Sequence, residues 1–150
     1  MAKRRVAELM NPDVVCARPE MSLADVAKLL ALRGVSGAPV VDEQGRILGV
    51  VSQSDLVRAS ERVPAEESGR FYSDDPDYRD LAALPVDVSD TPVAEVMSKR
   101  VHTVSRDTSA AVAANTMRER RIHRLVVTDR TRVVGVITSL DLLRVVEESC

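Results

Sequence analysis

Apolar residues recur every three or four positions between Leu23 and Leu30, with small or charged residues between them. This spacing places them on one face of a helix, so it predicts an amphipathic helix over residues 22–33. A second helix is predicted over residues 109–120. A serine or threonine stands at the start of each stretch, where its hydroxyl can cap the first turn.

Each predicted helix is followed by two continuous apolar runs joined by a short polar turn. Runs of this length, bounded by turn residues, are typical of buried strands, and two of them so close together predict a β-hairpin. A short helix is predicted after each hairpin, starting at Ser52 and Thr138. The predicted extended segments lie at residues 14–17, 38–41 and 47–51, and at residues 101–104, 125–128 and 133–137.

The same order of elements occurs twice because the sequence contains an internal repeat. Residues 6–10, Val-Ala-Glu-Leu-Met, recur 87 positions later as Val-Ala-Glu-Val-Met, and after a one-residue deletion residues 49–56 match residues 135–142. Of about 52 aligned positions, 17 are identical. A copy of about 50 residues buries too little surface to be stable alone. We therefore predict an α/β fold of two β-α-β-β-α repeats packed about a pseudo-twofold axis, each repeat preceded by a short helical lead-in.

The repeats are predicted to occupy residues 6–59 and 91–147, and the linker between them, residues 60–90, has no counterpart in either copy. The linker holds nine acidic residues and three arginines, so it carries a net charge of −6, whereas the whole chain carries −2. It also holds three prolines, which predicts a mostly irregular segment with one short helix at 77–84. Two interpretations stay open: a solvated loop, or an arm that packs its aromatic residues on a partner subunit.

Composition limits the class of protein. A content of 45% apolar and 29% charged residues is typical of a soluble globular protein, and the 25 valines favour buried strands. No apolar run approaches the ~20 residues that a membrane span needs, so we expect a cytoplasmic protein without a membrane partner. All three aromatic residues lie in the linker, which argues against a binder of nucleic acid. Cys16 and Cys150 are expected to be reduced thiols.

A Ser/Thr-x-x-Asp motif follows the last strand of each repeat, as Ser52 with Asp55 and as Thr138 with Asp141. This spacing is close to a capping box, which needs no ligand. It also suits a nucleotide, because the free N–H groups and hydroxyl at a helix N-terminus can hold phosphate and the acid can accept hydrogen bonds from a ribose. Both interpretations stay open.

A basic cluster ends the second predicted helix. Its arginines complement the helix dipole, but Arg124 directly precedes a buried strand, where it is better placed to bind a phosphate through its planar guanidinium. The first repeat has the uncharged residues Ser36, Gly37 and Ala38 at this place, so two sites would not be equivalent. The cluster consists of Arg118, Arg120, Arg121, His123 and Arg124.

Catalytic and metal-binding motifs are not found in the sequence. His102 and His123 stand at no metal-ligand spacing, and the chain contains no Cys-x-x-Cys, G-x-S-x-G or P-loop motif. Cys16 lies in a valine-rich extended segment, so it is more simply interpreted as a small buried apolar residue than as a nucleophile. We therefore predict no catalytic residues and no metal site.

These motifs together resemble a pair of cystathionine β-synthase (CBS) domains over residues 6–59 and 93–147. The resemblance rests on the Val-Ala-Glu-hydrophobic-Met lead-in, the Ala-Pro-Val-Val-Asp strand at residues 38–42, the Gly-Val-Val-Ser-Gln-Ser-Asp-Leu ending at residues 49–56, their second copies, and His123-Arg124. It implies a homodimeric module with no cofactor, which binds an adenosine-containing ligand (AMP, ADP, ATP, sometimes NAD or S-adenosylmethionine) in two clefts between the paired domains.

The resemblance also implies which residues line each cleft. One cleft would take Ser52 and Asp55 from the first repeat, with Thr103, His123 and Arg124 from the second. The other would take Thr138 and Asp141 from the second repeat, with Cys16, Ser36, Gly37 and Ala38 from the first. Two residues depart from the family pattern, because Cys16 replaces the usual threonine and Val126 replaces the proline that Pro39 preserves. The second cleft also lacks an arginine for phosphate.

We therefore expect a regulatory module that senses an adenosine nucleotide and is not an enzyme. Two alternatives stay open. One is a structural interaction module whose degenerate clefts bind no nucleotide. The other is an enzyme that uses Cys16 or His102.

Overall fold

The computed structural model describes residues 4–60, 70–72 and 90–149, which form two compact units. Residues 15–101 form one unit, which we call the inner unit because it lies within the other along the chain. The segment before residue 15 and the segment from residue 102 onward form the outer unit. Each unit therefore holds the hairpin of one repeat.

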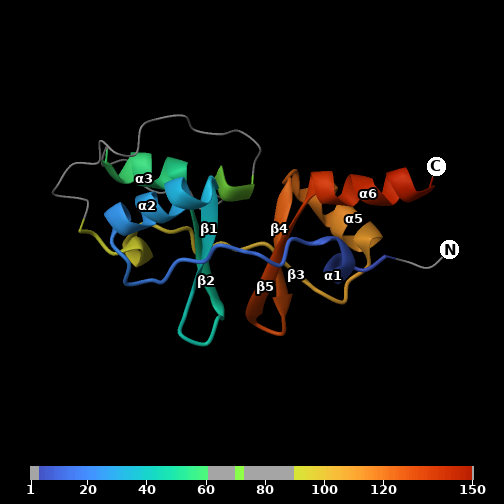
Figure 1. The fold of residues 1–150 in the computed structure, drawn as a ribbon, viewed down its shortest axis with the longest axis horizontal. Coiled ribbons are helices and arrows are strands. Elements are labelled where there is room, and N and C mark those ends of the chain that lie inside the picture. The colour runs from blue at the N-terminus through green and yellow to red at the C-terminus, as the bar shows by residue number, and fades with distance from the viewer. Residues whose placement is uncertain (1–3, 61–69, 73–89, 150) are drawn as a thin grey trace. The chain divides into compact units, whose positions relative to one another are not determined.

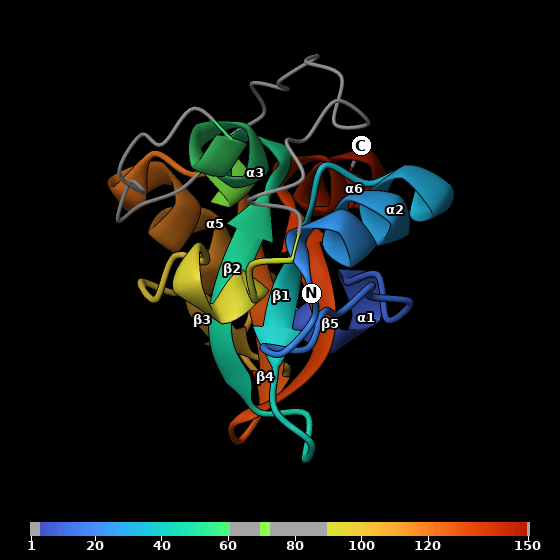
Figure 2. The ribbon, with the colours of Figure 1, turned by 90° about the vertical axis from the view of Figure 1, so that its left-hand side faces the viewer.

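The inner unit consists of α2 (Leu23–Arg33), β1 (Gly37–Val41), β2 (Ile47–Ser52), α3 (Gln53–Ser60), and the 3₁₀ turns η1 (Arg70–Tyr72) and η3 (Val93–Glu95). Strands β1 and β2 form an antiparallel hairpin in which Gly37 lies opposite Ser52. Ala17 adds a parallel bridge to Val40 on the other side of β1. Figure 2 shows α3 at one end of this hairpin and the β1–β2 turn at the other.

Local chemistry sets the limits of these elements. The Ser22 hydroxyl accepts a hydrogen bond from the Asp25 backbone N–H at 3.1 Å and caps α2. Gly34 ends the helix in the left-handed conformation, with φ of 65°. In the β1–β2 turn, Asp42 Oδ1 accepts hydrogen bonds from the backbone N–H groups of Gln44 and Arg46, at 2.8 and 2.9 Å.

The outer unit consists of α1 (Val6–Leu9), β3 (Thr103–Ser105), α5 (Ala110–Arg120), β4 (Arg124–Asp129), β5 (Arg132–Thr138) and α6 (Ser139–Ser149). Its three strands have the order β3-β4-β5, with β3 parallel and β5 antiparallel to β4. Figure 1 shows α1, in dark blue, near α5 and α6. A β-strand, a helix and a hairpin thus follow each other here as the sequence predicts.

Each unit has its own aliphatic core between its helices and one face of its strands. A fully buried valine or leucine contributes about 1.5–3 kcal/mol, so these clusters supply most of the stability of each unit. The inner core contains Ala17, Leu23, Val26, Ala27, Leu30, Ala38, Val40, Val51, Leu56 and Val93. The outer core contains Val6, Leu9, Ala110, Ala113, Met117, Leu125, Val127 and Ile137.

The two lead-in segments belong to the opposite repeat. The lead-in of the first repeat joins the outer unit, where the Arg4 carbonyl accepts a hydrogen bond from the Ala110 N–H at 2.8 Å at the start of α5. Asn11 exchanges two backbone hydrogen bonds with Val136 of β5, at 2.9 and 3.0 Å. The lead-in of the second repeat joins the inner unit in the same way, since Ser98 exchanges two backbone bonds with Val50 of β2. The lead-ins are thus exchanged between the repeats.

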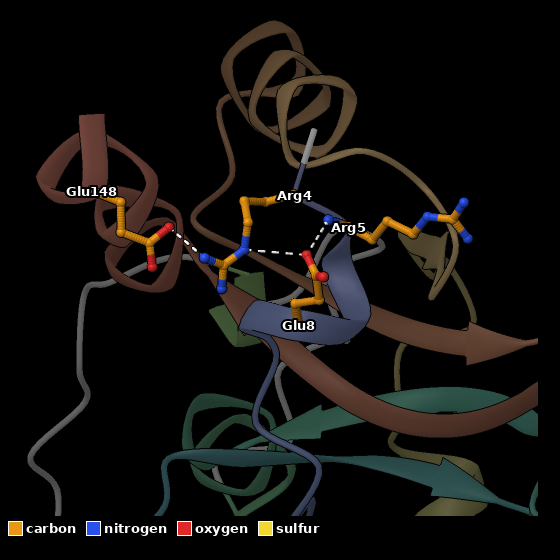
Figure 3. Close-up of polar contacts among 4 residues, drawn as sticks. All are labelled: Arg4, Arg5, Glu8 and Glu148. Carbon is orange, nitrogen blue, oxygen red and sulfur yellow. Dashed lines mark hydrogen bonds and ion pairs between the residues drawn. The ribbon is translucent and has the colours of Figure 1, made fainter. Parts of the chain in front are cut away.

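Charged side chains anchor the first lead-in. The Arg4 guanidinium contacts the carboxylates of Glu8, in α1, and of Glu148, in α6 (Figure 3). The Glu8 carboxylate also accepts a hydrogen bond from the Arg5 backbone N–H at 2.9 Å. This bond and the nearby Arg4 charge lower the pKa of Glu8. Both ends of the outer unit's chain are thereby held together.

Two glycines provide the space for the exchanged lead-ins. A Cβ atom on Gly135 would lie 2.7 Å from the Met10 sulfur and 2.9 Å from the Asn11 carbonyl oxygen. In the inner unit, a Cβ atom on Gly49 would lie 2.6 Å from the Ser98 carbonyl oxygen. The glycine shared by the two copies of the repeat is therefore explained by close approach of the lead-in backbone.

The helices over 22–33 and 109–120, the two hairpins and the helical lead-in at 6–10 are confirmed within one or two residues. The helix after the second hairpin is longer than predicted and reaches Ser149. Neither interpretation of the linker describes Phe71 and Tyr72, which lie in a 3₁₀ turn and are buried within this chain. The prediction of a mostly irregular linker stays a prediction, because residues 61–69 and 73–89 lie outside the described residues. The helix predicted at 77–84 lies outside the described residues.

Candidate functional site

The predicted site residues of the outer unit lie mainly on the sheet face that points away from its helices. Leu125 and Ile137 form a cross-strand pair and belong to the core that packs on the helices. Side chains alternate between the two faces of a sheet, so the next pair, Arg124 and Thr138, points to the other face. Thr103 in β3 pairs with Val126 and shares this face.

A reciprocal set of hydrogen bonds joins Thr138 to Asp141 at the start of α6. The Asp141 Oδ2 accepts from the Thr138 N–H at 2.8 Å and from the Thr138 hydroxyl at 3.1 Å. The Thr138 Oγ1 in turn accepts from the Asp141 N–H at 3.2 Å. This is a capping box, and it uses only Oδ2 of the carboxylate. A carboxylate has about four acceptor positions, so the cap and a ligand contact through Oδ1 are compatible.

Two basic residues adjoin this capping box. The His123 carbonyl accepts a hydrogen bond from the Ser139 N–H, the first residue of α6, at 2.8 Å. Arg124 follows His123 and is half-buried opposite Thr138. Residues that carry a hydroxyl, a carboxylate and a guanidinium thus lie at one end of the β4–β5 hairpin, next to His123 in the chain. This set can bind both a sugar hydroxyl and a phosphate.

The inner unit repeats the geometry with different side chains. The Ser52 N–H and hydroxyl donate to Asp55 Oδ2 at 2.8 and 3.2 Å, and Ser52 Oγ accepts from the Asp55 N–H at 3.3 Å. The Ser36 carbonyl accepts from the Gln53 N–H at 2.9 Å, as His123 does in the outer unit. Gly37 takes the place of Arg124, opposite Ser52. The inner unit therefore has the cap and the acid but no guanidinium at this place.

Cys16 and Ala38 have different surroundings. Val15 and Ala17 pack on the inner core, so the alternation of an extended chain directs Cys16 to the face of Gly37 and Ser52. Cys16 is a free, half-buried thiol whose pKa is raised by burial. The Ala38 side chain lies in the core, so only its backbone faces toward the predicted site.

The two capping boxes differ in solvent access. Ser52 and Asp55 are buried, with 3% and 1% of their surfaces exposed. Thr138 and Asp141 are only half-buried. A ligand in solution therefore reaches the outer constellation more easily.

The structure places Thr103, His123 and Arg124 in the same unit as Thr138 and Asp141, and it places Cys16, Ser36 and Gly37 in the same unit as Ser52 and Asp55. The predicted clefts combine residues across these two sets, and that combination stays a prediction. The capping-box interpretation of both motifs is confirmed. It does not exclude the ligand role of Asp141, because the capping box uses only its Oδ2.

Phe71 is the residue that the sequence analysis did not assign to this site. A Cβ atom on Gly37 would lie 2.8 Å from Phe71 Cδ2 and 3.3 Å from the Ser52 Cα. The Phe71 ring therefore lies where a side chain at position 37 would point, beside the capping box. The clustering of all aromatic residues in the linker was the one signal for it in the sequence.

The remaining observations concern His102, metal binding and membrane crossing. The Arg120 guanidinium lies 3.0 Å from His102 Nδ1, and since arginine has only donors, this ring nitrogen accepts. Among residues 4–60, 70–72 and 90–149, no three His, Cys, Asp or Glu side chains come together in a way that would hold a metal ion. Within the same residues, no helix has the length and apolar character needed to cross a membrane.

The sequence matches the CBS domain at residues 6–62 and 93–148. A curated relative, the inosine-5'-monophosphate dehydrogenase of Mycobacterium tuberculosis, is 32% identical over 146 residues, which are 96% of this chain and 22% of the dehydrogenase. Another curated relative is also much longer, since the chain spans 39% of it. The chain thus corresponds to a part of these proteins.

Two solved structures share the fold along nearly the whole chain. The structure of CBSX2 in complex with AMP has a TM-score of 0.71 and 23% identity, with 97% of this chain and 98% of that chain covered. The CBS domain pair of protein MJ0100, in complex with 5'-methylthioadenosine and S-adenosyl-L-methionine, has a TM-score of 0.69 and 23% identity, with 99% and 100% covered. At this identity the likeness concerns the fold.

Proposed function

Because the chain belongs to the CBS domain family, which matches both copies of its repeat, we propose that it is a regulatory module that senses an adenosine-containing ligand. The observation that carries this proposal is the constellation at the end of the β4–β5 hairpin, where Thr138, Asp141 and Arg124 come together. Two structural neighbours were solved with AMP and with S-adenosyl-L-methionine and 5'-methylthioadenosine, and all three ligands contain adenosine.

Each group in the outer unit has a distinct role in this proposal. Asp141 Oδ1 accepts hydrogen bonds from the ribose hydroxyls, while Oδ2 remains in the capping box. Arg124 binds phosphate with charge-assisted hydrogen bonds, each stabilising by about 1.5–3 kcal/mol. Thr138 supplies a hydroxyl at the N-terminus of α6, which favours negative charge. In this proposal Arg124 acts within its own unit, whereas the family resemblance combines it with Ser52 and Asp55 of the inner unit. The inner unit has Gly37 at this place, so on the assignment proposed here we expect it to favour less charged adenosine compounds.

The module is proposed to act by binding and not by catalysis. A thiol nucleophile reacts as the thiolate, and burial raises the pKa of Cys16, which keeps it protonated at neutral pH. The regulated activity would then belong to another protein or another domain. We propose a cytoplasmic location, where adenosine nucleotides are abundant.

We propose that the module is a homodimer. Three large apolar side chains lie exposed along α6, at intervals of three residues: Leu140, Leu143 and Val146. Leu140 is 73% exposed, whereas Ser54, which takes its place in the first repeat, is buried. An exposed apolar stripe on one helix fits a protein–protein contact. We propose that the partner at this stripe is a second copy of this chain.

A binding panel tests the proposed function. Purified protein would be titrated with AMP, ADP, ATP, NAD and S-adenosylmethionine, with GMP and inorganic phosphate as controls for the base and the charge. A ligand at 100 times its Kd should stabilise the native state by about 2.7 kcal/mol, which raises Tm by several degrees for a chain of this size. No shift with any adenosine compound at millimolar concentration would favour the alternative of a structural module without a ligand.

A further inference from the structure

An aromatic pair from the linker packs on β2 of the inner unit, and one of its rings lies beside the Gly37–Ser52 pair. Phe71 and Tyr72 form the 3₁₀ turn η1, which contacts β2 and is drawn in light green at the α3 end of the hairpin in Figure 1. Their ring centroids are 4.9 Å apart and their planes cross at 89°, an edge-to-face pair. Each is only 2% exposed. The pair is therefore a packed part of the inner unit.

Gly37 has no side chain, but the direction that its Cβ would take shows which face of the hairpin the pair covers. The Gly37 Cβ direction points away from the helices, because the adjacent Ala38 belongs to the core. Phe71 Cδ2 lies 2.8 Å from the position that this Cβ would occupy, and the Ser52 Cα lies 3.3 Å from it. The Phe71 ring thus covers the Gly37–Ser52 pair on the face where we expect the ligand.

The two repeats differ at this point. In the outer unit, Arg124 takes the place of Gly37 and lies opposite Thr138 in the register of the hairpin. Asp141 is half-buried there, whereas Asp55 is 1% exposed and Ser52 3%. A buried Phe71 offers no open ring face on which an adenine could stack. The Phe71 ring therefore occupies the space beside Gly37 and Ser52 that a ligand on this face would need.

We propose that Phe71 and Tyr72 are an autoinhibitory cover, which an adenosine ligand must displace before it can bind at Ser52 and Asp55. This proposal rests on the proposed function, since it concerns access to the same kind of site. Two binding sites of unequal strength follow from it. The outer site binds first, and the inner site binds only in the fraction of molecules whose cover is open.

The cover lowers the apparent affinity of the inner site by the fraction of molecules in which it is open. A minor conformation populated at about 1–10% would weaken binding about 10- to 100-fold. Removal of the aromatic rings should therefore raise the apparent affinity of the inner site by the same factor. Ligand binding at Ser52 and Asp55 should conversely move Tyr72 into solvent.

Isothermal titration of the full chain tests the proposal, with AMP and S-adenosylmethionine titrated separately. The variant Phe71→Ala/Tyr72→Ala should bind the weaker equivalent of ligand about 10- to 100-fold more tightly than the wild type, or show a second equivalent that the wild type lacks. Adding Asp55→Asn should remove this gain, and adding Asp141→Asn should leave it. Leu32→Ala, which truncates an exposed side chain of the same unit, serves as the matched control.

A second measurement avoids any loss of stability in the alanine variant. The chain has two tyrosines and no tryptophan, so Tyr78→Phe leaves Tyr72 as its single fluorescent reporter. Saturating AMP or S-adenosylmethionine should increase acrylamide quenching of Tyr72, and Asp55→Asn should abolish the increase. Two results together would overturn the proposed cover but not the proposed function: a ligand that binds without changing the quenching of Tyr72, and an unchanged affinity in the alanine variant. Absence of binding in the wild type and in every variant would overturn the proposed function as well.

Discussion

Arg124 lies directly opposite Thr138 where the β4–β5 hairpin meets helix α6. This pairing puts an arginine across the hairpin from a residue of a capping box, and it is absent from the inner unit because Gly37 takes the place of Arg124. The position therefore distinguishes the two repeats in charge. It is the point from which the phosphate preference of the protein can be tested.

We predict that Arg124→Ala weakens ADP and ATP far more than adenosine. Loss of a charged hydrogen bond to phosphate costs about 1.5–3 kcal/mol, which is about 10- to 150-fold in Kd. The measurement is calorimetric titration of all three compounds at two salt concentrations. Arg130→Ala, at the exposed turn of the same hairpin, is the control. An equal loss for adenosine and ATP would show that Arg124 does not contact phosphate.

Asp141→Asn separates the capping role of this residue from its proposed role in ribose binding. The capping box predicts a loss of at most about 1 kcal/mol in unfolding free energy. The ribose contact predicts a further loss of about 1.5–3 kcal/mol in binding free energy. Urea unfolding and titration of adenosine measure the two effects independently. Asp25→Asn, in the first turn of α2, is the control. Unchanged affinity in Asp141→Asn would show that Asp141 caps the helix and does not bind ribose.

Gly135→Ala should loosen the first lead-in from the outer unit. The new Cβ would lie 2.9 Å from the Asn11 carbonyl oxygen and 2.7 Å from the Met10 sulfur. Overpacking of this kind costs about 1–3 kcal/mol. We expect lower unfolding free energy and faster amide exchange at Val136, whose N–H donates to Asn11. Met10→Ala in the same chain should recover part of the loss, because the sulfur contact is relieved. A double-mutant cycle measures this recovery, and full stability of Gly135→Ala would contradict the close approach.

Asp42 should contribute to stability above its unfolded pKa, and the contribution should fall in acid. Hydrogen bonds from the Arg46 and Gln44 backbone N–H groups, with the Arg46 guanidinium, lower the pKa of Asp42 in the folded protein. A lowered folded pKa stabilises the native state above the unfolded value near pH 4 and loses that stabilisation as the pH falls through the folded value. Urea midpoints at pH 7 and pH 3 should differ less in Asp42→Asn than in the wild type.

The matched control for Asp42 is Glu43→Gln, which removes an exposed negative charge from the same turn. It should leave the difference between the two pH values close to that of the wild type. A change as large as that of Asp42→Asn would assign the effect to net charge instead of to the turn.

Leu140→Glu and Leu143→Glu should convert the proposed dimer into a monomer. A charge placed in the centre of an apolar contact leaves it buried and unpaired on association. Light scattering should give about twice 16.4 kDa for the wild type and 16.4 kDa for the variants. Leu32→Glu, on an exposed leucine of α2, should leave the mass unchanged. A wild-type mass of 16.4 kDa at all concentrations would contradict the dimer.

The elements that the sequence predicts correctly are those fixed by local rules. Ser22 and Ser109 cap α2 and α5 where the start signals place them, and the apolar runs form the hairpins. The internal repeat also predicts that both capping boxes share one geometry. Periodicity, caps and turns act over a few residues, so a single sequence contains them.

The exchange of the lead-ins could not be predicted in this way. Residues 6–10 have the same pattern as residues 93–97, so the sequence is equally consistent with each lead-in packing on its own repeat or on the other. The burial of Phe71 is also a tertiary effect, since it depends on the space above Gly37, 34 positions earlier in the chain. The second feature bears on the site, because the Phe71 ring lies beside the Gly37–Ser52 pair.

The exchange of lead-ins has a consequence for the order in which the protein is completed on the ribosome. The inner unit is encoded without interruption, so all of its segments have been made once residue 101 has left the exit tunnel. The first lead-in precedes the inner unit in the chain but docks on α5 and β5, which are translated after the inner unit. Val6 and Leu9 must therefore remain without their core while more than 90 further residues are synthesised. A nascent chain that stalls within the second repeat would expose this apolar segment to chaperones, whereas its inner unit would already be able to fold.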